Sequence, residues 1–144
     1  MSVLLTKTNS MNAHEFRIGN YIVVDGAIAL ILAVDSDGTE AVVETLTTKD
    51  NRIKTKISKI KPVPLTPQLL HENCQFDKSG KYNIGLDDYL YFLEFKEGYI
   101  SLLDRKGQVM IRFMDIRNLH QLQNLVYALK GIEMDICEFP HLTE

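Results

Sequence analysis

Tryptophan is absent from this sequence, cysteine occurs twice and proline four times, and no long apolar run is present. Two cysteines, Cys74 and Cys137, are too few for a disulfide scaffold. A membrane-spanning helix needs about 18 consecutive apolar residues and a secretory signal needs about 7, whereas the N-terminal region offers only Met1 and residues 3–5. We therefore expect reduced thiols, no membrane partner and a cytoplasmic location.

The composition is that of a soluble globular protein. The 144 residues are 45% hydrophobic and 24% charged, and the formal net charge is −3. This charge argues against a uniformly basic nucleic-acid coat, and the chain length corresponds to one ordinary domain or two small modules. We expect a loosely ordered extension over residues 1–13, a first module over 14–65 and a second over 66–144.

The first module has the pattern of short, tightly connected strands. Residues 16–24, 27–34, 40–45 and 52–57 favour β-structure, and turn signals separate the first three segments at Asp25-Gly26 and at residues 35–38. Four or five such strands within a short stretch bury one face by curling. The prediction is a small β-barrel-like sheet, followed over residues 57–66 by a helical turn and an extended, proline-rich linker.

The second module alternates helices and strands. A hydroxyl cap followed by proline, Thr66-Pro67, predicts a helix that runs to about Asn73 and places Cys74 inward. Strands are expected within 82–98, 99–103 and 108–113, and the apolar residues over 89–95 suggest a strand covered on both faces. The fold class is therefore α+β: a curled N-terminal sheet, then a helix, an antiparallel meander and an amphipathic C-terminal helix.

The C-terminal helix has the clearest boundaries. Asn118 is a capping residue, and Gln121 stands where its side chain reaches back to the cap. Leucine and valine then repeat at helical spacing until Gly131, which ends the helix. Four polar residues share one side of this helix and are candidates for binding a partner: His120, Gln123, Asn124 and Tyr127. A structural role, in which they hydrogen-bond to neighbouring strands, is the alternative that we favour.

A basic segment is the strongest charge feature. Residues 49–61 carry six basic side chains and one acidic one. Strand alternation would place part of them on one face, as in small barrels of the Tudor or KOW type that bind phosphates. The candidates for contacting nucleic acid are Arg52, Lys54, Lys56, Lys59 and Lys61. The plainer interpretation is an edge strand whose lysines prevent pairing with other strands, because no aromatic residue alternates with them.

Metal binding and catalysis have little support. His71 with Cys74 and Cys137 with His141 have spacings like those of zinc ligands, but such pairs arise easily by chance. Residues 35–38 begin like a calcium loop and lack its later ligands. No phosphate-binding glycine loop or nucleophile motif is present. We expect no catalytic residue, no metal, no cofactor and no enzyme activity.

Three blocks in the sequence resemble a family of small uncharacterised proteins common in Bacteroidetes chromosomes, prophages and phages. They are residues 16–21 (FRIGNY), residues 60–66 (IKPVPLT) and the last helix, with LHQLQNL running on to ALKG. The blocks span residues 14 to about 133. Cys74 and Val126 depart from the pattern, which has a larger apolar residue and an aromatic there. The resemblance implies a mobile-element origin and a non-enzymatic role, and it carries no functional residue.

These observations lead to one expected function and two alternatives. We expect a non-catalytic adaptor that binds another macromolecule, most simply a protein, through the edge of the N-terminal sheet or the polar side of the last helix. A nucleic-acid-binding module that uses the basic segment is the first alternative, and a metal- or thiol-dependent enzyme is the second. Self-association of the chain is also left open.

Overall fold

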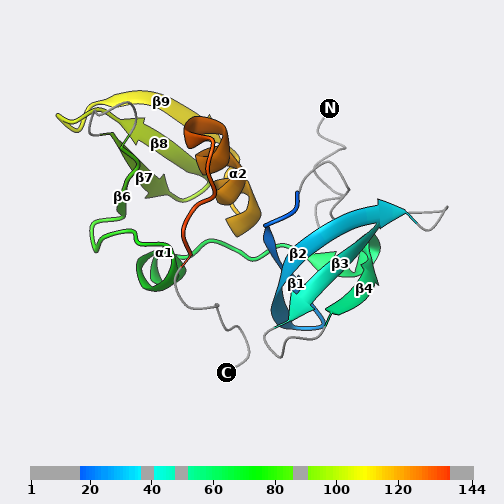
Figure 1. Ribbon diagram of the computed structural model, residues 1–144. Helices are drawn as coiled ribbons and strands as arrows, with labels where there is room; N and C mark the ends of the chain where they lie inside the picture. The colour runs from blue at the N-terminus through cyan, green and yellow to red at the C-terminus, as the bar shows by residue number, and fades with distance from the viewer. Residues whose placement is uncertain (1–16, 37–40, 48–51, 86–90, 137–144) are drawn as a thin grey trace, which may run out of the picture. The chain divides into compact units, whose positions relative to one another are not determined.

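The computed structural model describes residues 17–36, 41–47, 52–85 and 91–136. The protein is an α+β protein, and its chain divides into two compact units. Among the described residues, the first unit ends at Val63 and the second begins at Pro64 (Figure 1). The predicted extension over residues 1–13 lies outside the described residues.

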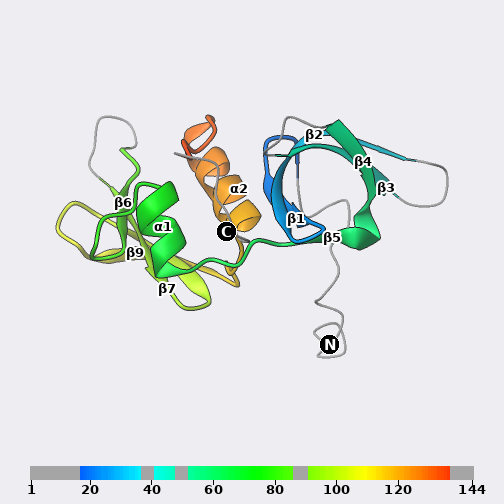
Figure 2. The same ribbon diagram turned by 90° about the horizontal axis from the view of Figure 1, so that it is seen from below.

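The first unit is a curled antiparallel sheet with the strand order β4-β3-β2-β1-β5. Its strands are β1 (Tyr21–Val24), β2 (Ala27–Ser36), β3 (Ala41–Thr47), β4 (Arg52–Lys56) and β5 (Ile60–Lys61). Figure 2 shows the strands arranged around a ring. Buried apolar side chains of this unit form its core: Ile22, Val24, Ala29, Ile31, Val43, Ile57 and Ile60. The predicted barrel-like sheet is therefore present.

Turn chemistry explains how this sheet begins. Asp25 and Gly26 both have positive φ, at 51° and 79°, and they connect β1 to β2 as the two-residue hairpin that the sequence predicts. Residues 17–19, predicted as strand, instead form a turn. There the buried Asn20 side chain accepts a hydrogen bond from the Arg17 amide at 2.8 Å, and Gly19 donates its amide to the Ile31 carbonyl at 2.9 Å.

The end of the first unit differs from the predicted linker. A 3-10 turn, Ile57–Lys59, matches the predicted helical turn, but the next two residues form β5 and pair with Val23 and Val24 of β1. The linker prediction rested on the closely spaced prolines. It was wrong for Ile60 and Lys61 because both precede the first proline and their amides remain available to a strand.

The second unit contains helix α1 (Pro67–Asn73), strands β6 (Lys81–Asn83), β7 (Phe92–Lys96), β8 (Tyr99–Leu103) and β9 (Val109–Met114), and helix α2 (Leu119–Lys130). The strands form one antiparallel sheet in the order β6-β7-β8-β9. As predicted, the Thr66 hydroxyl caps α1 by accepting a hydrogen bond from the Leu69 amide at 3.1 Å, and Cys74 is fully buried.

The boundaries of α2 also follow the sequence. The Gln121 side chain reaches back and accepts hydrogen bonds from the amides of Arg117 and Asn118, at 2.8 and 3.0 Å. Gly131, with φ of 76°, ends the helix and donates its amide to the Tyr127 carbonyl at 2.7 Å. A residue other than glycine rarely adopts this conformation, which explains why the helix stops here.

The most covered strand is β8 and not the predicted 89–95 segment. Residues 89 and 90 lie outside the described residues, and Phe92 and Glu94 of β7 are only half-buried. Residues 100–103 of β8, in contrast, are all buried. The reason is the position in the sheet: the neighbours of β8 are the five-residue β7 and the six-residue β9, whereas one neighbour of β7 is the three-residue β6.

Candidate functional site

The basic row of the first unit lies on an edge strand. The alternation of β4 and its pairing with β3 place Arg52, Lys54 and Lys56 on the outer face of the curled sheet. Glu44 of β3 pairs with Lys54 in register, and its carboxylate lies 3.6 Å from the Arg52 guanidinium. The acidic neighbour therefore offsets part of the charge of this row.

The remaining basic candidates follow β4 in the chain and lie off its edge, since β5 stands at the other end of the strand order. Lys59 lies in the 3-10 turn and Lys61 in β5, and both are exposed, as are Lys54 and Lys56. Within the described ranges none of these four lysines forms an ion pair. Among the described residues no aromatic side chain adjoins the β4 row, because Tyr21 lies in β1, which β3 and β2 separate from β4 in the strand order. The Tyr21 side chain is half-buried, and this burial raises the pKa of its hydroxyl.

The polar row on α2 is largely inside the second unit. His120 and Gln123 are each 1% exposed, whereas Asn124 is half-buried and Tyr127 is 44% exposed. The prediction that all four form one partner-binding surface is therefore wrong for His120 and Gln123. The cause is a wider buried arc than the leucine pattern indicated: Leu119, Leu122 and Val126 are buried, and the arc continues past them around the helix.

His120 is unusual among these residues because neither of its ring nitrogens has a hydrogen-bond partner in the described part of the chain. Burial without a partner disfavours the charged imidazolium and lowers the pKa of His120 to about 4. The favoured alternative, a hydrogen bond from this row to neighbouring strands, does not apply to His120. The side chain is instead a neutral polar group in an apolar interior.

Strand β9 carries an exposed apolar surface that the sequence interpretation missed. Val109, Met110, Ile111 and Met114 are 46, 50, 47 and 63% exposed. The strand ends the sheet order, so among the described residues it pairs only with β8, and its other backbone edge is unpaired. A register shift between Leu102 and Leu103 places Met110 as an extra residue opposite β8. Such a bulge is common at sheet edges.

Basic side chains surround this apolar strip. Arg105 and Lys106 occupy the turn before β9 and are exposed, and Arg112 within the strand lies over the Tyr99 ring at 5.9 Å. In the part of the chain that the structure describes, none of these three forms an ion pair. Beyond the strand, Arg117 is 3.7 Å from the Asp115 carboxylate. The surface around β9 is therefore apolar with uncompensated positive charge.

The edge strands β4 and β9 contrast with each other. The β4 sequence, RIKTK, presents a charge at every second position, which is how natural edge strands avoid pairing with foreign strands. The β9 sequence, VMIRFM, presents one charge and leaves apolar residues exposed. The signal that could have revealed this edge was present: the last strand of a meander has one neighbour, and this one lacks alternating polar residues.

No metal site is formed by the described residues, which contain no group of three potential ligands. The exposed His71 directs its Nδ1 toward the Phe76 carbonyl at 2.9 Å, whereas Cys74 is fully buried. The other pair that we considered, Cys137 and His141, lies outside the described residues. So do Lys49 of the basic segment and part of the turn over residues 35–38.

No protein-family model, curated protein or solved structure shows significant similarity to this chain. The resemblance to a mobile-element family therefore stays a prediction. None of the described helices is long and apolar enough to cross a bilayer.

Proposed function

We propose that the protein is a non-catalytic, protein-binding adaptor whose β9 edge accepts an extended strand from a partner. The observation that carries this proposal is the exposed apolar edge of β9, which combines a backbone that no other described strand pairs with four apolar side chains that are 46–63% exposed. Addition of a strand satisfies such an edge: main-chain hydrogen bonds supply affinity, and the flanking side chains supply specificity.

The charges around β9 indicate the chemistry of the partner. Arg105, Lys106 and Arg112 favour a strand that has apolar residues in its middle and acidic residues beside them. A second copy of this chain would bring the same positive charges to the contact, which disfavours self-association through this edge. We therefore assign the edge to a different protein that carries an acidic-apolar segment.

A peptide-display selection tests the proposal. The full-length protein is used to enrich random extended peptides, and we expect sequences that alternate apolar residues and carry Asp or Glu at their ends. The variant with Met110→Lys and Met114→Lys converts the edge into one like β4 and is expected to lose this enrichment. Ile132→Lys is the matched control, because Ile132 is 59% exposed in the same unit and lies outside β9.

Two results would count against the proposal. One is the enrichment of the same peptides by the wild type and the double variant, and the other is the absence of any common pattern among the selected peptides. Self-association at β9 would show as a dimer by light scattering that the double variant abolishes. That outcome would replace the partner by a second copy.

Nucleic-acid binding by the first unit is the second candidate. It is supported by four exposed lysines that form no ion pair among the described residues: Lys54 and Lys56 on β4, Lys59 in the 3-10 turn and Lys61 on β5. The pairing of Arg52 with Glu44 argues against it. Fluorescence anisotropy with labelled DNA and RNA at two salt concentrations tests it. Binding that weakens with salt and disappears in Lys54→Glu/Lys56→Glu would support this function, and no binding at low salt would refute it.

The biological setting is part of the proposal. A role in a phage, prophage or other mobile element rests on the three sequence blocks that resemble such proteins. A cytoplasmic location is supported by the cysteine content, since two cysteines are too few for a disulfide scaffold.

A further inference from the structure

The second unit contains a cavity of about 510 Å³ that no part of the proposed function uses. It is bounded by α1, by the loop that follows this helix and by β7. Leu70 and Phe76, both almost fully buried, line it together with Phe95. Cavities of roughly 300–1,000 Å³ with apolar walls and a few polar groups are typical of sites for small molecules.

His71 contributes a hydrogen-bond acceptor to this cavity. Its Nδ1 lies 2.9 Å from the Phe76 carbonyl oxygen, which can only accept, so Nδ1 carries the proton and donates it. In the neutral ring, Nε2 then carries a lone pair. The Phe76 backbone is itself held in place, because its amide donates to the Leu70 carbonyl at 3.0 Å and its ring stacks on Tyr82 at 5.2 Å.

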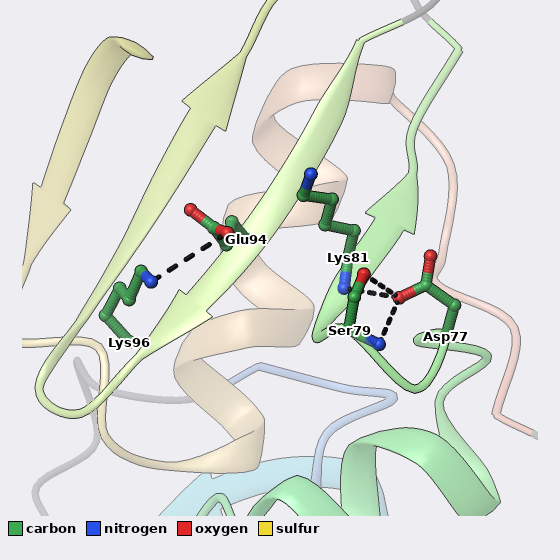
Figure 3. Close-up of polar contacts among 5 residues, drawn as sticks. All are labelled: Asp77, Ser79, Lys81, Glu94 and Lys96. Atoms are coloured by element: carbon green, nitrogen blue, oxygen red, sulfur yellow. Dashed lines mark hydrogen bonds and ion pairs between the residues drawn. The ribbon is translucent and has the colours of Figure 1, made fainter. Parts of the chain in front are cut away.

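A rigid turn forms the wall opposite α1. One carboxylate oxygen of Asp77 accepts three hydrogen bonds, from the Ser79 hydroxyl at 2.7 Å and from the amides of Ser79 and Lys81 at 2.9 and 3.0 Å (Figure 3). These donors, with the nearby charge of Lys81, hold the pKa of Asp77 below its usual value. The Ser79 hydroxyl donates its hydrogen bond to Asp77, so the lone pairs of its oxygen remain available to accept one from a ligand.

Lys78 adds a positive charge to the same wall. It lies at the tip of the turn, lines the cavity and, within the described ranges, forms no ion pair. The Asp77 carboxylate lines the same wall and stays negatively charged, but one of its oxygens is already occupied by the three donors of the turn. The cavity therefore offers apolar walls, two acceptors (His71 Nε2 and Ser79 Oγ) and the ammonium group of Lys78.

We propose that this cavity binds a small aromatic carboxylate that also carries an N–H or O–H donor. The ring would lie against Phe76 and Phe95, the carboxylate would pair with Lys78, and the donor would bond to His71 Nε2 or Ser79 Oγ. The turn and the fixed imidazole are already in place, so binding costs little reorganisation. This site is independent of the β9 edge.

Three probes separate the contributions to binding. Indole-3-acetate has the ring, the carboxylate and an N–H donor, indole-3-acetamide has no charge, and naphthalene-1-acetate has no ring donor. Each is titrated into the full-length, ¹⁵N-labelled protein while the amide chemical shifts are followed by NMR. We expect indole-3-acetate to bind most tightly and to shift the amides of Ser79, Gly80 and Phe95.

Variants place the binding in the cavity. Lys78→Gln should weaken indole-3-acetate by about two- to fivefold, as expected for an exposed ion pair, and should leave indole-3-acetamide unaffected. Gln68→Trp, a substitution at an exposed position of the cavity rim, should abolish binding of both. Lys106→Gln is the matched control because Lys106 is exposed in the same unit and does not line the cavity.

The proposal is overturned if none of the probes shifts these amides at millimolar concentration. It is also overturned if the shifts fall on residues 109–114 of β9, or if all three probes bind equally to the wild type and to Lys78→Gln. The spectrum of each variant without ligand shows whether it folds, so a folding defect is not mistaken for lost binding. None of these results changes the peptide selection that tests the β9 edge.

Discussion

The buried, unpartnered His120 makes the stability of the second unit depend on pH. In the folded state its ring stays neutral down to a pKa of about 4, while in the unfolded chain it takes up a proton at about 6.5. Since the unfolded state binds the proton first, the free energy of unfolding falls as pH decreases through this window. Above pH 6.5 the contribution of neutral His120 to the free energy of unfolding is fully present, and below pH 4 this contribution is lost.

The size of the effect follows from the two pKa values. The difference between 6.5 and about 4, at about 1.36 kcal/mol per pKa unit, corresponds to about 3 kcal/mol between neutral pH and pH below 4. At pH 5 the unfolded ring is almost fully protonated and the folded ring is not, so about 2 kcal/mol is already lost. Stabilities of small domains are about 5–15 kcal/mol, so this loss is easily measured.

The assay is urea unfolding of the full-length protein at pH 8, 6, 5 and 4.5, followed by the methyl NMR signals of Leu122 and Val126 in the second unit. The variant His120→Leu should remove most of this pH dependence and, because it also removes two buried ring nitrogens without partners, should not be less stable at pH 5. His71→Gln should keep the dependence, since His71 is exposed. An unchanged pH slope in His120→Leu would refute the reasoning.

Three further predictions concern the turns and caps. Thr66→Ala should destabilise the second unit by about 1 kcal/mol in denaturant unfolding through loss of the α1 cap, while Thr66→Ser keeps most of the stability. Asp77→Asn should speed amide exchange at Ser79 and Lys81 above pH 4, where the wild-type Asp77 carboxylate is ionised and accepts all three hydrogen bonds. Because the pKa of Asp77 is lowered, acid should weaken the wild-type turn only at lower pH. Equal exchange rates in the variant and the wild type above pH 4 would contradict this prediction. Gly26→Ala should cost the first unit about 1 kcal/mol in the same unfolding assay, because φ of 79° is unfavourable for alanine, and no change would argue against the two-residue hairpin.

Local signals were read correctly where neighbouring residues decide the conformation. The hairpin at Asp25-Gly26 and the helix end at Gly131 depend on residues that tolerate positive φ. The start of α1 depends on the Thr66 hydroxyl, which accepts a hydrogen bond, and on Pro67, which has no amide hydrogen that needs a partner. Each of these is a property of a single residue. The curled sheet followed as well, because several short strands with tight turns can bury one face in few other ways.

What the sequence did not reveal depends on contacts between distant segments. The burial of His120 and Gln123 depends on what lies beside α2. When the buried face of a helix is inferred from the spacing of its leucines, the polar residues are assigned to the solvent-exposed face. The exposure of β9 depends on its being last in the sheet order. The cavity forms where α1, the turn at Asp77 and Phe95 lie close together, and no residue spacing in the sequence predicts that these segments are neighbours.

Hydrogen exchange of the β9 amides with a selected acidic-apolar peptide tests the central claim most directly. The account predicts that the peptide slows exchange within residues 109–114, leaves the amides of β4 unchanged, and has no effect on the variant carrying Met110→Lys and Met114→Lys. Protection that falls on β4 or α2, or that persists in this variant, would contradict the assignment of β9 as the protein-binding edge.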